Sequence, residues 1–541
     1  MTKFRVALIS FGVSRGKDFF NPVYKYSPTP ALYYIESPLQ AAGHRTLVVD
    51  QAVQDLTDDE VLDAVRAFAP DVALFTQLAT TRKLVRWASD ELAESCIVGI
   101  GGHDPTFHAL QLTKDDFQEQ YAHADFVWQG EADSGLVEFL ADFQPMGRPE
   151  RVNNLAHRVL DLDQLPVPRH DNYPGTAGFL ITSRGCLKFG AGCEFCTTPQ
   201  FYRDGFRARS PEHVRTEIEQ LHHAGKSLVH IYDDNFLGFS ERDLMRGIEI
   251  LRIFREYGLR VTFMAIVDQL LRIERMGLQD ELRDVVAEVF IGIENGGQAA
   301  LEQLGKKFGP KKYMNKSARA MDIITASGAS IYPGYINFYP EVTAAELASS
   351  AAFLRDNHTM AAYFRLFVKD LELYEGTPLF DSYASAPPDG VELREGERGY
   401  QYGFSEPGIN ELYGFLRFYA FGHAVVPDFL LYWGSLLIAA SDLHDTTDAA
   451  DYRELRESVN ATNYNFFIEM LDISSQRNSF YIQQMVLRLA EFQKATARAG
   501  RELLPLLIRL HDHGSFQHPE FRATLDRVPV APEAPLVVGN P

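Results

Sequence analysis

The sequence predicts an α/β protein in three parts: a doubly wound α/β domain, a partial barrel of six β/α units, and a mainly helical C-terminal region. Up to about residue 373, short runs of β-branched and aromatic residues alternate with helical patterns, which is typical of parallel sheets covered by helices. From about residue 395 onward, helical patterns rich in aromatic residues replace this alternation. At 541 residues the chain is too long for one hydrophobic core, so several domains are expected.

Composition and charge exclude several classes of protein. The apolar content of 46% is ordinary for a globular protein, and the formal net charge of −21 argues against a nucleic-acid-binding surface. The first residues run into a strand pattern without an apolar signal segment. The longest apolar run, 429–440, is shorter than the ~20 residues of a membrane span, so we expect a buried helix. We therefore expect a cytoplasmic protein that binds neither nucleic acid nor membranes.

The first 150 residues predict the doubly wound domain. A helix is expected over 57–68, because Thr57 can cap it and acidic residues fill its first turn. The expected strands are short β-branched or aromatic runs: 6–9, 46–49, 72–75, 97–100 and 126–128.

Ligands bind such sheets at the carboxyl ends of the strands. The residues there are small or polar: Ser10, Gly12, Thr76, Gln77, Gly101, Gly102, Gly130 and Glu131. Glycines at these positions allow a large planar ligand to approach the backbone closely. A flavodoxin-like domain without a cofactor is the alternative, because a fold does not imply a ligand.

A proline-marked linker, 151–175, leads to a second β/α series over 176–395. Six units would close most of a barrel, with the chemistry at the carboxyl ends of the strands. The expected strands are 179–182, 228–232, 260–266, 289–293, 330–338 and 365–373.

The rest of the chain predicts a helical region over 396–525 and a proline-rich, disordered tail over 526–541. Aromatic stripes at helical spacing are more often core than cofactor site, so we expect this region to be packed core.

Three of the four cysteines, Cys186, Cys193 and Cys196, stand on one loop after the first strand of the second series. Three thiolates can hold three irons of a cubane cluster and leave the fourth iron open to a small molecule. A structural zinc site is an alternative, but it requires four ligands, and the fourth cysteine, Cys96, is far away in an apolar run. Coincidence is another alternative, and a disulfide is disfavoured in a chain so poor in cysteine.

The flanks of this loop resemble a known family. They are the runs from Phe179 to Cys186 and from Cys196 to Pro199, and Phe-Arg-Ala-Arg-Ser-Pro over 206–211. They resemble the radical S-adenosylmethionine enzymes, specifically the subclass with an N-terminal cobalamin-binding domain. The usual loop has three residues between its first two cysteines, whereas this one has six, including Gly190 and Gly192.

The resemblance assigns residues to the cofactors. It implies a 4Fe–4S cluster on the three loop cysteines. Around S-adenosylmethionine it places Phe195 of the loop and residues at three later strand ends: Asp233, Asp234, Gly292, Glu294, Gly376 and Thr377. Segments 30–50, 98–106 and 125–131 resemble the cobalamin domain, so the strand-end residues of the first sheet would bind cobalamin. The family's histidine motif below cobalt is absent from 10–16, so cobalt would have no histidine from that motif.

These parts together imply methylation of an unactivated carbon of a small molecule in a biosynthetic pathway, with an electron donor such as flavodoxin or ferredoxin. The resemblance assigns no catalytic residue beyond the cofactors and does not name the substrate. Two alternatives stay open. The chain could catalyse a rearrangement, cyclisation or ring contraction without methyl transfer, or it could be a non-catalytic iron–sulfur or corrinoid sensor.

Overall fold

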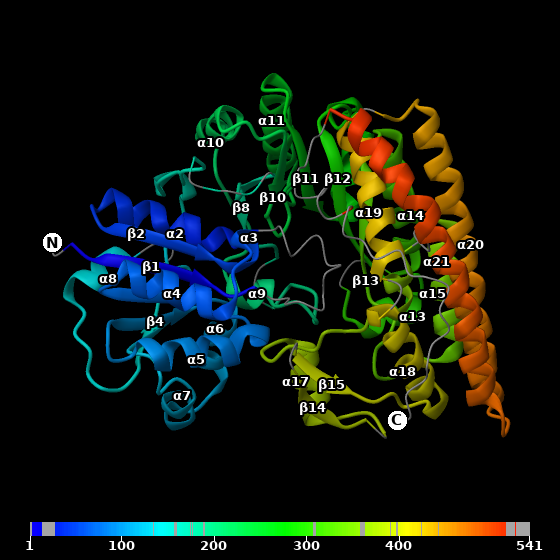
Figure 1. Ribbon diagram of the computed structural model, residues 1–541, viewed down its shortest axis with the longest axis horizontal. Helices are drawn as coiled ribbons and strands as arrows, with labels where there is room; N and C mark the ends of the chain where they lie inside the picture. Colours follow the sequence, from blue (N-terminus) through cyan, green and yellow to red (C-terminus); the bar gives the residue numbers. More distant parts are fainter. Residues whose placement is uncertain are drawn as a thin grey trace.

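The computed structural model places two α/β halves side by side, with a layer of long helices at the far end. The first sheet is blue in Figure 1, the second sheet is green, and the C-terminal helices run from yellow to red. The structure describes residues 3–515 and 525, except 13–27, 134, 156–158, 172, 174, 176, 188–189, 307–309, 358–362, 390, 397–398, 423–424 and 442. The predicted tail, 526–541, and the part of segment 10–16 after Gly12 lie outside these residues.

The first sheet has six parallel strands in the order β2-β1-β3-β4-β5-β6. The chain reverses its direction of travel across the sheet between β1 and β3, which is a topological switch point of the doubly wound fold. All five predicted strands are present, and the sixth, β6, was not predicted because its Glu-Arg-Val-Asn sequence lacks an apolar run. The strands are β1 (Arg5–Ser10), β2 (Arg45–Asp50), β3 (Val72–Thr76), β4 (Ile97–Gly101), β5 (Phe126–Gln129) and β6 (Glu150–Asn153).

Helices cover both faces of this sheet. Ala7 and Ile9 of β1 share a core with α4 and α5, whereas Val6 and Leu8 share a core with α2 and α8. The predicted helix start is confirmed, because Thr57 forms a capping box with Glu60. The helices of this half are α2 (Pro30–Ala41), α3 (Gln51–Gln54), α4 (Asp58–Phe68), α5 (Arg82–Leu92), α6 (His103–Gln111), α7 (Lys114–Gln120) and α8 (Leu136–Asp142).

The second sheet has five parallel strands in the order β13-β12-β11-β10-β7. They are β7 (Gly178–Leu180), β10 (Leu228–Ile231), β11 (Arg260–Ala265), β12 (Val286–Glu294) and β13 (Ser330–Tyr335). The helices between and after them are α10 (Pro211–His223), α11 (Glu241–Glu256), α12 (Val267–Arg275), α13 (Gln298–Gln303), α14 (Pro310–Ala326) and α15 (Ala344–Asp356).

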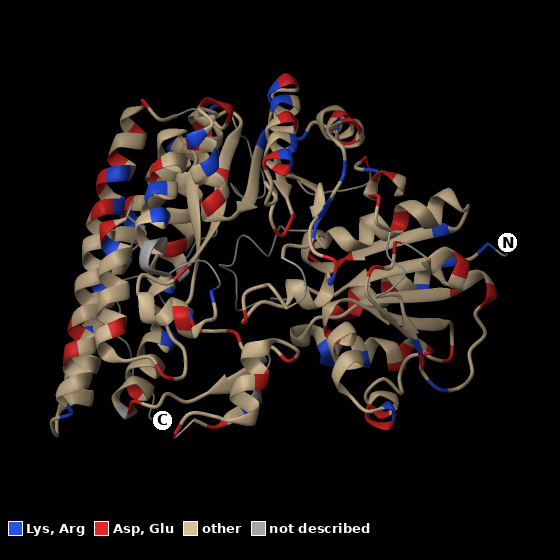
Figure 2. Cartoon of the chain, turned by 180° about the vertical axis from the view of Figure 1, so that it is seen from behind, with Lys and Arg blue, Asp and Glu red and all other residues tan. Residues whose placement is uncertain are grey.

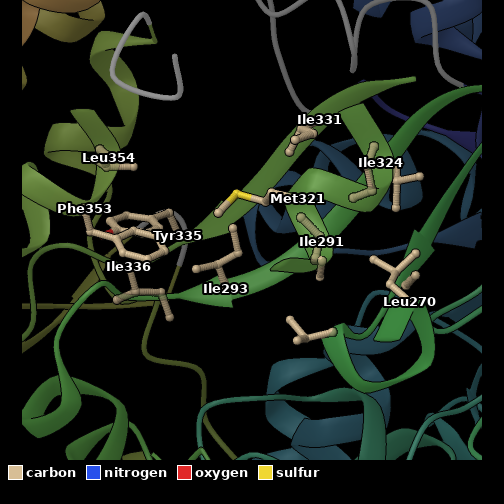
Figure 3. Close-up of a cluster of buried hydrophobic side chains, with 14 of the residues drawn as sticks. Leu270, Ile291, Ile293, Met321, Ile324, Ile331, Tyr335, Ile336, Phe353 and Leu354 are labelled. Carbon is tan, nitrogen blue, oxygen red and sulfur yellow. The ribbon is translucent and has the colours of Figure 1, made fainter. Parts of the chain in front are cut away.

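The two faces of the second sheet differ in character. On the outer face, Ile291, Ile293 and Ile331 pack against helix side chains such as Met321 of α14 (Figure 3). The inner face carries the polar and aromatic side chains of neighbouring strands: His230, Thr262, Glu288, Phe290, Ser330 and Tyr332.

The prediction of a sixth strand over 365–373 is wrong. Residues Phe364–Val368 form a helix, α16, and only a single parallel bridge joins Phe338 to Asp370. The buried carboxylate of Asp428 accepts hydrogen bonds from the backbone N–H groups of Phe364 (2.8 Å) and Arg365 (2.9 Å). This distant side chain caps the helix start, so a tertiary contact overrides the short apolar pattern that resembles a strand.

Long helices form the C-terminal layer: α18 (Pro407–Gly422), α19 (Val425–Ala440), α20 (Thr447–Gln476) and α21 (Tyr481–His513). The buried helix predicted over 429–440 is confirmed as part of α19. It lies against the inner face of the second sheet, where Tyr432 donates a hydrogen bond to Glu288 (3.2 Å). Acidic and basic residues are interspersed along the outer helices (Figure 2). Among the described helices, none combines the length and hydropathy that a membrane crossing requires.

Candidate active site

The cysteine loop connects the two strands of a small antiparallel pair that follows β7. Strand β8 (Ser183–Arg184) pairs with β9 (Arg207–Ala208), so residues 185–206 form a closed loop that contains the short helix α9 (Thr198–Phe201). The loop follows the first strand of the second sheet, where the sequence predicted chemistry. Within it, the N–H of Cys196 donates to the carbonyl of Cys193 (3.2 Å), and Gly190 has a φ of +77°, a conformation that favours glycine.

None of the three loop thiols forms a disulfide, and all three are half-buried. Burial, followed by the nearby Cys196 and Asp234, raises the pKa of Cys186 to about 12. Burial also raises the pKa of Cys196. Thiolates crowded in this way need a cation to neutralise them, which an iron–sulfur cluster supplies.

A single metal ion fits this loop less well than a cluster. Within the described ranges, no three Cys, His, Asp or Glu side chains converge on one ion. The sulfurs of a cubane bind different irons and therefore need not meet at one point. Cys96 lies before the amino end of β4, packed against the core of the first domain. The structure therefore does not bring the fourth cysteine to the loop.

Two predicted acids after β10 hold this loop and its stem. Both oxygens of Asp233 accept hydrogen bonds, from the Thr182 N–H (2.6 Å) and the Ser183 hydroxyl (2.7 Å) among others. Asp234 accepts from the N–H of Gly185 (3.0 Å) and the hydroxyl of Thr198 (3.0 Å), on either side of the cysteines. Burial raises the pKa of Asp234 to about 6.

The end of β12 carries a bulge beside the loop. The register against β13 shifts between Gly292 and Glu294, and Glu294 has a φ of +68°. Bulges and left-handed non-glycine residues are common next to active sites. Lys306 Nζ lies 2.7 Å from Glu294 Oε1. The pKa of Cys196 is raised mainly by burial, and the negative charges of Asp234 and Glu294 raise it further.

Lys306 was not predicted as a site residue. Burial lowers the pKa of Lys306, but the nearby carboxylate of Glu294 outweighs this effect and holds the pKa above its ordinary value. Lys306 also donates to the carbonyl of Gly292 (3.1 Å). The position of Lys306 just after α13, the short helix that follows β12, could have indicated a role in the site, because a long side chain there can reach back to the strand end.

The remaining predicted residues of this half also lie near the loop. Thr377 caps α17 (Pro378–Ser385), and the next turn touches the loop, because the N–H of Leu379 donates to the carbonyl of Glu194 (3.0 Å). Gly376 has a φ of +82° and approaches Gln111 of the first domain. Phe195 is half-buried at the edge of the main core. A hairpin of β14 (Leu393–Gly396) and β15 (Gly399–Tyr402) follows α17.

At the first sheet, the predicted strand ends form one edge. Ser10 and Gly101 both stand level with Thr76 in the register. A Cβ on Gly102, whose φ is +113°, would lie 2.8 Å from the carbonyl oxygen of Gln77, so only glycine fits there. This close-packed glycine edge is compatible with a large planar ligand lying against the backbone.

Other residues predicted at this edge have partners inside the protein. Gln77 is buried and donates to Asp104 (2.7 Å). The N–H of Gly12 donates to Gln51 (2.8 Å), and that of Gly130 donates to Thr106 (3.1 Å).

The two halves meet through buried polar contacts that were not predicted. The first is an ion-pair cluster of Glu131 and Asp133 with Arg184 and Arg207. The sequence offered no local signal for it, because its acids and its arginines come from distant segments.

The second contact centres on Glu217 of α10. The Tyr34 hydroxyl of α2 donates to it (2.8 Å), Arg209 pairs with it (2.6 Å), and His170 of the linker lies 2.8 Å away. Burial raises the pKa of Glu217, but Arg209 and His170 outweigh this effect and hold the pKa below its ordinary value. In addition, His103 at the edge of the first sheet contacts the ring of Phe201 in α9, with 4.6 Å between ring centroids. The glycine edge therefore faces the cysteine loop.

Comparison with known proteins agrees with this layout, although no family model matches the chain. The chain is 25% identical over 392 residues to an uncharacterised methyltransferase of Pyrococcus horikoshii, which covers 66% of the chain and 79% of that protein. It is 27% identical over 312 residues to cytidylyl-2-hydroxyethylphosphonate methyltransferase of Streptomyces wedmorensis, covering 47% and 55% of the two chains.

A solved structure extends the likeness to nearly the whole chain. OxsB, a cobalamin-dependent S-adenosylmethionine radical enzyme solved with aqua-cobalamin and S-adenosylmethionine bound, superposes with a TM-score of 0.69 at 15% identity. The superposition covers 97% of this chain and 83% of OxsB. The resemblance drawn from the cysteine loop is thus confirmed: the chain has the fold of a cobalamin-dependent radical S-adenosylmethionine enzyme and is similar in sequence to methyltransferases.

Proposed function

We propose that the chain is a radical S-adenosylmethionine enzyme that uses a 4Fe–4S cluster and cobalamin to methylate an unactivated carbon of a small molecule. The observation that carries this proposal is the face-to-face arrangement of the cysteine loop and the glycine edge of the first sheet. A radical site alone supports hydrogen abstraction, and a corrinoid site alone supports methyl transfer to a nucleophile. An unactivated carbon is not a nucleophile, so its methylation requires both sites together.

Each part of the site has a role in this proposal. Cys186, Cys193 and Cys196 would hold the cluster, while Asp234 and Glu294 would hold the loop and the β12 bulge that border S-adenosylmethionine. Cobalamin would lie against the first sheet at Ser10, Gly12, Thr76, Gly101, Gly102 and Gly130. Bound there, the cofactors supply one-electron reduction of S-adenosylmethionine and a methyl group for a carbon radical.

The protein's own task is then to position the substrate and exclude water. On the inner face of the second sheet, Tyr332 contacts Phe290, with 5.5 Å between ring centroids, and Tyr432 of α19, with 5.6 Å. Tyr332 is 36% exposed, and Tyr232, which directly precedes the Asp233 and Asp234 that hold the loop, is 37% exposed. We propose that this surface is the substrate wall, because an apolar wall orients a substrate and keeps solvent from a reactive carbon.

The decisive experiment needs no knowledge of the substrate. Protein reconstituted anaerobically with iron, sulfide and cobalamin is given a strong reductant and S-adenosylmethionine labelled in its methyl group. We expect 5′-deoxyadenosine, and separately S-adenosylhomocysteine together with labelled methylcobalamin. Formation of 5′-deoxyadenosine without any labelled methylcobalamin would favour rearrangement, cyclisation or ring contraction. Absence of both products would favour a non-catalytic sensor.

A further inference from the structure

The loop that carries the three cysteines is closed at its base by a carboxylate from the other half of the molecule. Arg184 ends one stem of the loop and Arg207 begins the other, and the two stand opposite each other in the β8–β9 pair. Glu131, just after β5 of the first sheet, binds both: its Oε1 is 2.7 Å from Arg184 Nη1, and its Oε2 is 2.9 Å from Arg207 Nη2. One side chain thus joins both stems.

These charges are removed from water. The side chains of Glu131, Arg184 and Arg207 are each less than 10% exposed. Two buried arginines side by side repel each other, so the pair of stems depends on a shared anion. Asp133 also binds Arg184 through both carboxylate oxygens, Oδ1 with Nη1 at 3.1 Å and Oδ2 with Nη2, but the contacts of the described residues include none from Asp133 to Arg207.

Glu131 also belongs to the glycine edge that faces the loop. It directly follows Gly130, whose φ of +86° turns the chain at the carboxyl end of β5. Arg184 lies two residues before Cys186. A displacement of the sheet edge is therefore passed to the first cysteine through one ion pair and a short piece of backbone.

We propose that Glu131 is a positioning residue: it fixes the base of the cysteine loop against the edge of the first sheet and so sets the alignment of the two halves of the active site. Its carboxylate oxygens are engaged by the arginines, which distinguishes this role from direct contact with cobalamin. The inference rests on the proposed function for its consequence, the alignment of two cofactors. The contact of Glu131 with Arg184 and Arg207, here called the clamp, does not depend on the proposed function.

The test compares Glu131→Gln with Asp133→Asn, which is a matched control because Asp133 holds only one stem. Full-length protein is loaded with cluster and cobalamin, and three quantities are measured: bound cobalamin, hydrogen exchange over 185–206, and the two half-reactions. For Glu131→Gln we expect normal cobalamin content and exchange faster by about tenfold. Remethylation of cobalamin should fall about tenfold, while 5′-deoxyadenosine formation, which uses the barrel half alone, changes little. Asp133→Asn should show smaller effects on exchange and remethylation.

Several results would overturn the proposal. Loss of cobalamin with unchanged loop exchange would make Glu131 a cofactor contact instead. A parallel fall in both half-reactions would indicate a general structural defect. If Glu131→Gln does not fold, Arg207→Lys keeps the charge but loosens the second stem, and it should also slow remethylation selectively. Failure of the unaltered protein to cleave S-adenosylmethionine would contradict the proposed function but leave the exchange result, and hence the clamp, to be judged separately.

Discussion

At the scale of single residues, the site contains three carboxylates, of which two hold backbone N–H groups and the third pairs with a lysine. Asp233 fixes the stem after β7, Asp234 spans the cysteines, and Glu294 pairs with Lys306 at the β12 bulge. The family resemblance placed these acids at the strand ends around S-adenosylmethionine, in agreement with the rule that chemistry gathers at the carboxyl ends of such strands. Their partners could not be predicted, because a hydrogen bond to a hydroxyl or backbone group far along the chain leaves no pattern in the sequence.

The cysteines give the first prediction. Replacing Cys186, Cys193 or Cys196 by Ala should abolish both the cluster and the cleavage of S-adenosylmethionine, because each removes one iron ligand. Cys96→Ala is the control and should keep both, since Cys96 lies behind the first sheet. Iron and sulfide per chain and 5′-deoxyadenosine yield are the measurements. Loss of the cluster in Cys96→Ala would mean a four-cysteine site without an open iron.

The second prediction concerns Glu288, a carboxyl on the inner face of the second sheet. Burial raises its pKa to about 8. Because the folded value exceeds the unfolded value, Glu288 stabilises the fold only at low pH, and this contribution is lost as pH rises from about 4.5 to about 8. Glu288→Gln stays neutral, so relative to the unaltered protein it should be more stable at pH 8 than at pH 5, by at least about 1 kcal/mol. Urea unfolding at the two pH values checks this, and a pH-independent difference would refute it.

At the scale of elements, the strands of both sheets followed from β-branched runs, and two elements did not. The edge strand β6 is polar and short, so it carries no strand signal. Helix α16 has a strand-like composition but is capped by Asp428 from α19. Local patterns decide an element only where no distant side chain competes for its backbone.

The third prediction tests that cap. Asp428→Ala removes both acceptors from the first turn of α16 and should lower the free energy of unfolding by about 2 kcal/mol, near the upper end for a helix cap. Asp428→Asn, which keeps one acceptor, should cost less. Hydrogen exchange of residues 364–368 locates the effect. If both variants are destabilised equally and hydrogen exchange over 364–368 does not become faster, the carboxylate acts through its charge rather than as a cap.

At the scale of the whole molecule, the two halves are joined by buried ion pairs and by an apolar cluster in which Tyr33 of α2 packs against Phe179 of β7. The Tyr34–Glu217–His170–Arg209 cluster ties the first helix, the linker and the second half together. Domain order could be predicted from the sequence, but this joint could not, because its members are spread over residues 34–217.

The fourth prediction follows from the joint. Glu217→Gln leaves Arg209 buried without its anion and should cost about 3 kcal/mol or more. Glu219→Gln changes an exposed acid on the same helix and should be nearly neutral. Chemical denaturation gives the energies, and limited proteolysis of the linker reports separation of the halves. A loss of stability that is equal in the two variants would argue against the joint.

Helix α19 has a consequence for how this protein could acquire new specificities. The second sheet is open, with β13 and β7 at its two edges, and a helix from the C-terminal layer lies across its inner face, with Tyr432 against Glu288 and Tyr332. In the proposed function, α19 would set the depth of the reaction chamber, the space between this face and the cysteine loop, although it carries none of the proposed cofactor contacts. Substitutions along that helix can resize the chamber while the cysteine loop and the glycine edge stay as they are, so selectivity and radical chemistry are free to evolve independently.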